Sequence, residues 1–268
     1  MRELQAGLWH WQAPHPDWTP AERWPQVVSS YAIDDGAHVL LFDPLAVPSE
    51  IFELAADREL VIVLTAPWHE RDTKRLVERL GVPVFVPPPD TADDLMRKYG
   101  ITPEQAAGGS PDIAWLLAGD SGAVHLYLAG DRLPIGIEAL LGREHNDLVL
   151  WIDRVGAVIS GDTLVDFGRG LEINEWLRGG VTREEVAERL RPLLERPGRG
   201  RAPGARSTDR PCCARARAVP LAARRRKSRG CGRILGWATV LSPERELAIA
   251  CCRNDNGNGP EGSSFKSW

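Results

Sequence analysis

The sequence predicts an α/β fold of four layers, in which two β-sheets lie face to face and helices cover the outer side of each sheet. Three observations predict it. Strand-like runs alternate with helical segments through residues 1–195, signals for hairpins and for parallel crossovers both occur, and each half of this region ends in helices. With 43% hydrophobic residues over 268 positions, the chain can form a large core, which excludes a disordered protein as a whole.

The first half of this region combines one hairpin with a βαβ unit. Two apolar runs flank an Asp-Asp-Gly turn at residues 34–36, and an Asp-Gly pair is typical of tight antiparallel hairpins. The later apolar run LVIVLT is typical of a strand buried on both faces. A helix capped by Asp72 or Thr73 and ended by Gly81 connects it to another strand, so we expect parallel pairing there. The expected strands are residues 27–33, 37–43, 60–65 and 83–87, and the expected helices are residues 48–57 and 72–80.

The second half predicts four more strands and three helices. Its last helix begins with a capping box from Thr182 to Glu185 and carries an apolar stripe that includes Val186 and Leu190. This stripe predicts that the helix packs on the outer face of the second sheet. The expected strands are residues 123–129, 132–139, 146–152 and 155–160, and the expected helices are residues 91–98, 172–178 and 182–195.

Residues 196–268 form a chemically different segment. Residues 1–195 carry 17 Lys and Arg against 32 Asp and Glu, whereas residues 196–268 carry 16 against 5 and all five cysteines. A segment so rich in Arg, Pro and Gly buries too little apolar surface to offset its ordering entropy, so we expect a mostly disordered basic tail. Its low-complexity composition also fits a shifted reading frame of a GC-rich gene. As a selected sequence, it would favour association with nucleic acid through phosphate contacts.

The chain also lacks the sequence features of membrane insertion and secretion. No run of 18 apolar residues occurs, and the first residues, MRELQAGLWHWQ, lack the basic start and apolar stretch of a signal peptide. We therefore expect a cytoplasmic protein without membrane contact.

Three segments carry a family resemblance. Residues 30–43 end an apolar strand on Asp-Pro, residues 61–72 read VIVLTAPWHERD, and residues 140–164 end in Ser-Gly-Asp-Thr-Leu. In this order they resemble motifs of the metallo-β-lactamase superfamily of hydrolases. The resemblance covers residues 1–195 and implies an αββα sandwich. It also implies that the last strand and helix of that fold, with its final histidine, are missing from this region.

The resemblance implies a metal site that is depleted here. In the family, His and Asp side chains hold one or two zinc ions, and the metal lowers the pKa of a bound water so that hydroxide attacks a carbonyl or phosphoryl group. Aligning Leu-Thr of this chain with the family motif puts Ala66, Trp68, Glu70 and Arg71 at the His, His, Asp and His positions. Arg143 stands where a further His is expected. Asp162 alone keeps a metal-bridging position.

An offset alignment retains part of a ligand set. His69 and Asp72 lie three residues apart and would face the same cavity as Asp162. These three groups, with His145 as a further candidate, would then ligate zinc. Our preferred hypothesis is different: guanidinium groups of Arg71 and Arg143 pair with Asp72 and Asp162 in place of a metal, so that none is bound. The resemblance also implies that Asp43 does not ligate the metal itself but orients the residues that do.

Three functions follow as hypotheses. The first is hydrolysis of an ester, thioester, amide or phosphoester, with catalysis by a water held near Asp162 and His69. The second is a non-catalytic protein whose cavity binds a small anionic metabolite or a protein partner through Arg71 and Arg143. The third is nucleic-acid association through the basic tail.

Overall fold

A seven-stranded sheet is built from the N-terminal part of the protein, whose structure, a computed structural model, describes residues 1–119, 124–166, 170–196 and 248–250. β1 to β4 pair antiparallel in chain order, and β4 to β7 pair parallel. The change of direction follows β4, where the chain leaves the predicted hairpin and begins the predicted βαβ crossover. The strands are β1 (Arg2–Gln5), β2 (Leu8–Pro14), β3 (Val27–Asp34), β4 (His38–Phe42), β5 (Glu59–Val63), β6 (Val84–Val86) and β7 (Val124–Leu126).

A second sheet of five strands follows in the chain. β8 to β11 form an antiparallel meander, and β14 pairs parallel with the free edge of β11. A separate two-stranded ribbon, β12 with β13, comes after β11. The strands are β8 (Arg132–Leu133), β9 (Ile137–Glu144), β10 (Asp147–Ile152), β11 (Ala157–Ser160), β12 (Leu164–Val165), β13 (Glu172–Ile173) and β14 (Ala248–Ala250).

The helices begin and end largely where their capping residues predict. Gly81 ends α2 with φ of 65°, a left-handed conformation that glycine adopts without strain. Thr182 and Glu185 form the predicted capping box of α5. Asp72 precedes α2 but makes no capping hydrogen bond. The α-helices are α1 (Ser49–Leu54), α2 (Thr73–Leu80), α3 (Ala92–Tyr99), α4 (Ala114–Ala118) and α5 (Arg183–Arg189), and the 3-10 turns are η1 (Pro67–His69), η2 (Pro134–Gly136) and η3 (Arg191–Glu195).

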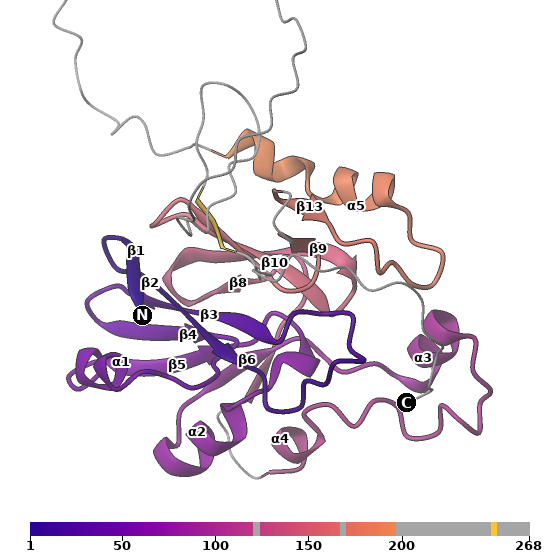
Figure 1. The fold of residues 1–268 in the computed structure, drawn as a ribbon, viewed down its shortest axis with the longest axis horizontal. Coiled ribbons are helices and arrows are strands. Elements are labelled where there is room, and N and C mark those ends of the chain that lie inside the picture. Colours follow the sequence, from indigo (N-terminus) through magenta and orange to yellow (C-terminus); the bar gives the residue numbers. More distant parts are fainter. Residues whose placement is uncertain (120–123, 167–169, 197–247, 251–268) are drawn as a thin grey trace, which may run out of the picture.

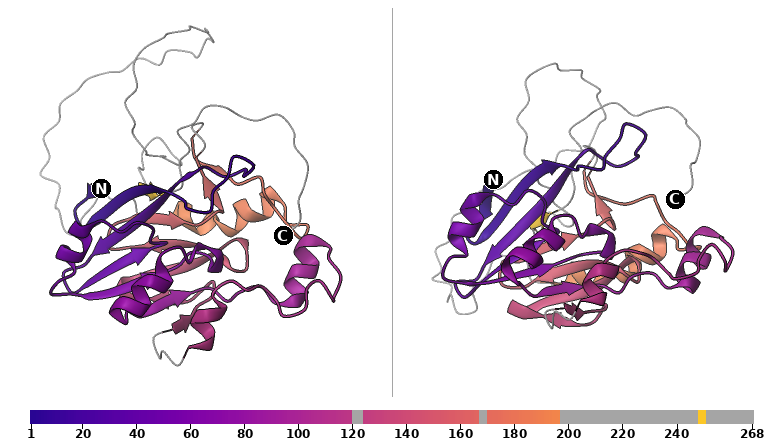
Figure 2. Two further views of the ribbon diagram at one scale, coloured as in Figure 1. Left: turned by 60° about the horizontal axis from the view of Figure 1, so that its bottom comes forward. Right: turned by 90° about the horizontal axis from the view of Figure 1, so that it is seen from below.

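These elements form the four predicted layers (Figures 1 and 2). The inner faces of the two sheets share one apolar core, with Phe42 from β4 and Leu150 from β10 among its fully buried side chains. A second core packs α1, α2 and α4 against the outer face of the larger sheet, for example through Ile51 and Ile62. A third packs α5 and η3 against the outer face of the smaller sheet around Trp151. The αββα sandwich expected from the sequence is confirmed.

Two segments differ from the prediction. The helix expected at residues 172–178 is absent: β13 pairs with β12 there, and a turn follows. The apolar spacing in this segment is short enough to fit either structure, and the tertiary partner decides, because the backbone N–H of Asn174 donates to the carbonyl of Thr163. The strand expected at 132–139 is also displaced, since β9 extends to Glu144 and places Arg143 on a strand.

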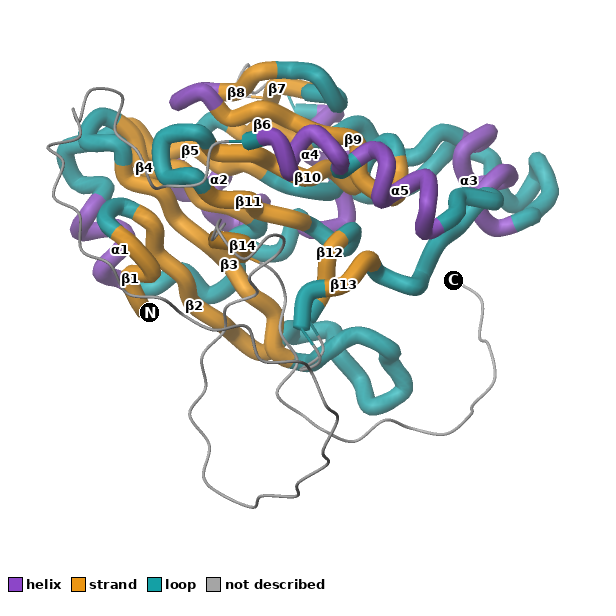
Figure 3. The backbone as a smooth tube through the Cα atoms, turned by 90° about the horizontal axis from the view of Figure 1, so that it is seen from above, coloured by secondary structure: helices purple, strands orange, loops and turns teal. Residues whose placement is uncertain are grey.

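One short strand of the predicted tail, β14, belongs to the described part of the chain. Within residues 196–268, the structure describes Arg196 and β14, and β14 lies beside β11 (Figure 3). Residues of the tail therefore add an edge strand to the second sheet. The predicted disorder and the proposed nucleic-acid contacts otherwise concern residues outside the described part of the chain. In that described part, no helix has the length and apolar character needed to cross a membrane.

Candidate functional site

The candidate site lies where the ends of several strands of both sheets meet. Asp43 directly follows β4 and Thr65 lies just after β5, so the parallel pairing of these strands brings the two side chains together. The turn η1 then positions Trp68 and His69. Asp162 follows β11 in the facing sheet. The site thus closes the gap between the sheets at one end of the sandwich.

His69 forms the centre of this group and contacts polar groups through both ring nitrogens. Its Nδ1 lies 3.1 Å from Oδ2 of Asp43 and 3.0 Å from Oγ1 of Thr65, and its Nε2 lies 3.4 Å from Oδ1 of Asp162. Burial alone would lower the pKa of His69, but the carboxylates of Asp43 and Asp162 outweigh it and raise the pKa to about 10. His69 is therefore an imidazolium ion at neutral pH.

The carboxylate of Asp162 is surrounded by donors. Its Oδ2 accepts hydrogen bonds from Trp68 Nε1 and Arg143 Nη2, each at 3.0 Å, while Oδ1 faces His69. Burial would raise the pKa of Asp162, but His69 and Arg143 lower it far below its usual range. Asp162 is ionised, and each of its oxygens already has a cationic partner.

Arg143 uses every nitrogen of its guanidinium group. Nε donates to Oδ2 of Asp147 at 2.6 Å, Nη1 donates to the carbonyl of Trp176 at 2.7 Å, and Nη2 donates to Asp162. Asp147 is fully buried at the start of β10, and its Oδ1 accepts from the backbone N–H of Asp162 at 3.0 Å. Burial and the Asp162 carboxylate raise the pKa of Asp147, although Arg143 opposes this. Arg143 thus bridges two carboxylates.

Two glycines allow the strands to approach closely at the site. A Cβ on Gly161 would lie 2.6 Å from Oδ1 of Asp147 and 2.8 Å from Oγ1 of Thr65. A Cβ on Gly142 would lie 2.1 Å from both the carbonyl oxygen of Asp147 and Oγ1 of Thr163. A side chain at either position would force these neighbouring atoms to move, which explains physically why Gly stands within the Ser-Gly-Asp sequence.

The predicted residues are only partly brought together. His69 and Asp162 meet, and Asp43 contacts His69 from behind. Asp72 points elsewhere: its Oδ2 accepts from Ala46 N at 2.6 Å and pairs with Arg75. A ligand set of His69, Asp72 and Asp162 therefore does not converge, and the predicted pairing of Arg71 with Asp72 is wrong.

Arg71 instead binds backbone carbonyls. Its Nη1 donates to the carbonyl oxygens of Ser29 and Asp43, each at 2.7 Å. Its own φ of 42° lies in the left-handed region, which is strained for a residue other than glycine and is often found at functional sites. The geometry of this turn directs the guanidinium toward the mouth of the site, where it lines a cavity.

His69 and Asp162 are among the residues that line that cavity, which encloses about 280 Å³. Three indole side chains, two imidazoles and Arg71 supply most of its lining. Burial and the nearby Arg71 lower the pKa of His15, so this imidazole is neutral at pH 7. The lining residues are His15, Trp24, Pro25, Val28, Trp68, His69, Arg71, Asp162, Val165, Asn174 and Trp176.

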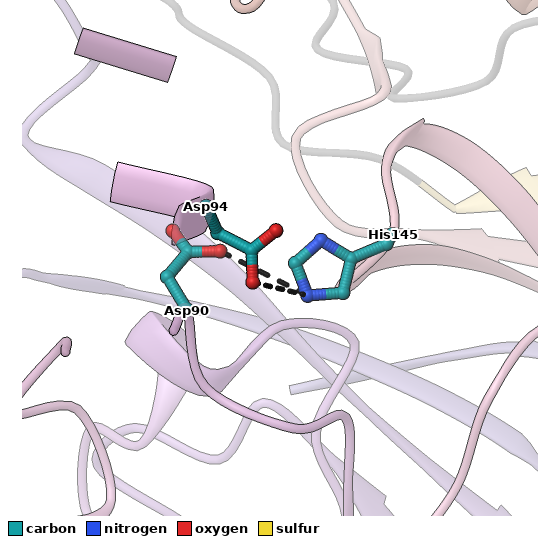
Figure 4. A group of neighbouring side chains, drawn as sticks. All are labelled: Asp90, Asp94 and His145. Carbon is teal, nitrogen blue, oxygen red and sulfur yellow. Dashed lines mark ion pairs between the residues drawn. The ribbon is translucent and has the colours of Figure 1, made fainter. Parts of the chain in front are cut away.

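A second group of potential metal ligands lies beside this site (Figure 4). Asp90, Asp94 and His145 each offer one ligand atom, and these atoms lie within 4.8 Å of one another. His145 Nε2 faces both carboxylates, at 3.9 Å from Asp90 and 3.7 Å from Asp94. However, Lys98 Nζ lies only 2.7 Å from the same oxygen of Asp90 that faces His145. This ammonium group already supplies the positive charge that a metal ion would bring.

Sequence reasoning missed several residues of the main site. Asp147, Trp68 as a donor to Asp162, and Asn174 were not identified. Asp147 follows Asn146 in a segment that has the composition of a turn. The one sequence signal for its burial is its position directly before the apolar run LVLWI. Trp68 was noted only as the residue at a lost histidine position.

Comparison with known proteins finds likeness at the level of structure alone. No protein-family model and no curated protein matches the chain. Among solved structures, the BLEG-1 B3 metallo-β-lactamase is 18% identical, with a TM-score of 0.44 over 71% of this chain and 88% of that one. The superfamily protein ST1585 from Sulfolobus tokodaii is 15% identical, with a TM-score of 0.45 over 70% and 75%. The family protein TTHA1429 from Thermus thermophilus is 17% identical, with a TM-score of 0.41 over 72% and 70%. These similar structures are metallo-β-lactamase proteins.

Proposed function

We propose that this chain is a metallo-β-lactamase superfamily protein in which an ion-pair network has replaced the metal centre, and that its cavity binds a small anionic molecule. The observation that carries the proposal is the position of Arg143, whose guanidinium bonds to Asp162 and Asp147 at once. The αββα layers and the three sequence segments support the family assignment.

The residues present do not fit a metal at the inherited position. Zinc ligands must be deprotonated and must direct a lone pair at the ion. His69 is protonated and shares both nitrogens with carboxylates, while both oxygens of Asp162 accept from cations or an indole N–H. Two positive groups next to the one retained ligand would also repel a dication. We derive no catalytic step through a metal here.

Hydrolysis without a metal is the second candidate, because His69 and Asp162 form a pair at the floor of a cavity. In this arrangement His69 would need to accept a proton from water, but its raised pKa keeps it protonated at neutral pH. Asp162 is a weak base since its pKa is lowered. The chemistry of the pair therefore favours binding over hydrolysis, and Asp162→Ala is expected to abolish any hydrolysis that the chain performs.

The free donors of Arg71 favour an anionic ligand at the mouth of the site. Arg71 is the cation that still has free donors, because its hydrogen bonds within the described residues all use Nη1. The remaining nitrogens of Arg71 are available for a carboxylate or phosphate. The cations are His69, Arg71 and Arg143, and the carboxylates that neutralise them are Asp43, Asp147 and Asp162.

Metal analysis of the purified full-length chain tests the proposal. We expect less than 0.1 zinc per chain after equilibration with zinc and removal of free metal, and an unchanged melting temperature with and without a chelator. Arg143→His, which restores the residue type of the family at that position, provides the comparison variant. One tightly bound zinc per wild-type chain, lost together with fold stability on chelation, would refute the proposal.

A further inference from the structure

Asn174 is one of the residues that line the cavity, and it carries an unpaired buried donor that points to the chemistry of the ligand. Asn174 is 1% exposed, and its Nδ2 has no hydrogen-bond partner among the described residues. The orientation of the amide is fixed because Oδ1 accepts the backbone N–H of Trp176 at 3.0 Å, so the atom left over is the donor. A buried donor without a partner is unfavourable. An acceptor atom of a ligand would satisfy it.

A second group in the cavity requires an acceptor as well. Arg71 lines the same cavity and retains free donors on Nε and Nη2 within the described part of the chain. A guanidinium group and an amide N–H together match the oxygens of a carboxylate better than a hydroxyl or a cation, because both are donors and one carries charge. The polar groups therefore select an oxyanion.

The remaining lining residues indicate what the uncharged part of the ligand is. Trp24, Trp68 and Trp176 contribute indole groups, and Pro25, Val28 and Val165 add apolar surface. Aromatic walls favour flat apolar groups, which pack against rings face to face or edge to face. The volume of about 280 Å³ lies at the lower limit of ligand pockets, which bounds the ligand to a small molecule.

We infer, on the basis of the proposed function, that the cavity binds a small aromatic carboxylic acid. Its carboxylate contacts Arg71 and Nδ2 of Asn174, and its ring lies among the three indoles. The charged group sets the orientation, while the ring supplies the buried apolar area. An uncharged analogue of the same shape retains only the binding energy from burial of the ring.

Matched probes test this directly on the full-length chain. Indole-3-acetate is titrated by calorimetry against indole-3-acetamide, which has the same ring and a neutral amide in place of the carboxylate, and acetate serves as an anion without a ring. We expect the acid to bind at least tenfold more tightly than the amide and acetate to bind more weakly than either. Equal affinity for acid and amide, or no binding of either, would overturn the inference.

Two variants assign the contact to residues. Asn174→Asp keeps an oxygen for the Trp176 N–H but replaces the donor by a negative charge, so the affinity for indole-3-acetate is expected to fall at least tenfold and that for the amide much less. Arg71→Gln is expected to act in the same direction. Arg75→Gln on the exposed side of α2 is the matched control and is expected to leave binding unchanged. An unaltered preference for the acid in both site variants would overturn the inference.

Failure of the inference and failure of the proposed function give different results. Zinc content is measured on the same samples as the titrations. A metal-free protein that binds acid and amide alike would retain the proposed network but refute the carboxylic-acid ligand. Stoichiometric zinc would refute the network itself, whatever the probes bind.

Discussion

His69 lies between two buried carboxylates, and its charge is the property on which the electrostatics of the site depend. Asp43 faces one ring nitrogen and Asp162 faces the other. Without a proton on His69, the two carboxylates would lie near one another with one cation fewer to neutralise them, which is unfavourable in a site shielded from water. The imidazolium ion and the guanidinium of Arg143 together supply the positive charge for the group.

The first prediction concerns the pH dependence of stability. Since the pKa of His69 rises from 6.5 in the unfolded chain to about 10 in the folded protein, its contribution is fully present below pH 6.5 and is lost as the pH rises toward 10. We expect the free energy of unfolding to fall over this range by roughly 5 kcal/mol through this group. Urea unfolding at a series of pH values measures it, with His69→Gln as the variant in which the fall is reduced. A histidine titration by NMR that gives His69 a pKa near 6.5 would contradict the prediction.

The second prediction concerns Arg143. Arg143→Ala is expected to lower the free energy of unfolding by about 3–5 kcal/mol, because it leaves the fully buried Asp147 and its neighbour Asp162 without their shared cation. Chemical denaturation measures the loss. Arg79→Ala, at an exposed position on α2, is the control and should change stability by less than about 0.5 kcal/mol. Equal effects of the two substitutions would show that Arg143 is not part of a buried network.

The sequence predicted residue types of the site better than their contacts. Arg143 was expected to replace a lost ligand by pairing with Asp162, and the two residues meet. The pairing of Arg71 with Asp72 failed, because spacing along one loop does not specify which way each side chain turns. The contribution of Asp147 depends on a β-bulge between β9 and β10, which brings it next to Arg143. Register irregularities of this kind leave no signal in the pattern of apolar residues.

At the scale of elements, the close packing of β10 against the loop after β11 depends on the absence of side chains at two glycines. The third prediction is that Gly161→Ala lowers the free energy of unfolding by about 1–3 kcal/mol, because the new methyl group would overlap Asp147 and Thr65. Gly130→Ala is the control: it has a positive φ but open space around it, so it tests backbone strain without overlap. Thermal unfolding of both variants measures the difference, and an equal or smaller loss for Gly161→Ala would contradict the prediction.

Helix α3 is attached to the β9–β10 turn by buried charges. Lys98, whose side chain is 2% exposed, pairs with Asp90 at 2.7 Å and Glu144 at 3.4 Å and also contacts the amide of Asn146. This cluster lies next to Trp68, since Lys98 Nζ is 5.8 Å from the centre of the indole ring. The helix therefore supports the main site from outside through electrostatic contacts.

The fourth prediction follows from this attachment. Lys98→Met removes the ammonium but keeps the length of the side chain, and it is expected to destabilise the protein by about 3–5 kcal/mol because two buried carboxylates lose their partner. Hydrogen exchange should show the earliest loss of protection in α3. Lys74→Met, at an exposed position of α2, is the control. A variant as stable as the wild type would show that the cluster does not hold the helix.

Most elements could be predicted from their apolar patterns, including short strands such as β6 and β11, but one short segment could not. The hairpin of β3 and β4, the parallel strand β5 and the helices α2 and α5 lie close to their expected positions. In contrast, the segment at 172–178 has spacing that fits a helix but forms β13 and a turn, because β12 offers it a partner. Segments of a few residues are decided by their tertiary neighbours.

At the scale of the whole molecule, the sandwich could be deduced from the order of elements, but the completion of its second sheet could not. The sequence predicted a missing last strand and an uncovered edge of the sheet. In the structure β14 pairs along β11, and its residues come from the segment with the composition of a tail. The apolar run LAIA at 247–250 is visible in the sequence, but the Arg-, Pro- and Gly-rich composition of residues 196–268 led us to expect disorder there.

The fifth prediction concerns that edge. A chain that ends at residue 195 exposes the backbone donors and acceptors of β11, and an exposed strand edge promotes association. We expect the truncated chain to form dimers or larger species by light scattering at concentrations where the full chain is monodisperse. A chain that ends at residue 253 retains β14 and is the matched control. Equal masses of the two truncated chains would contradict a protective role of β14.

The network around Arg143 also determines what the protein requires from its surroundings. In this chain the positive charges that hold the two sheets together at one end are covalently part of the polypeptide, through Arg143 and His69. Under the proposed metal-free function, biosynthesis of the functional molecule would depend on translation and folding alone, with no loading step and no competition for trace elements. Growth under zinc starvation would leave its cellular abundance unaffected.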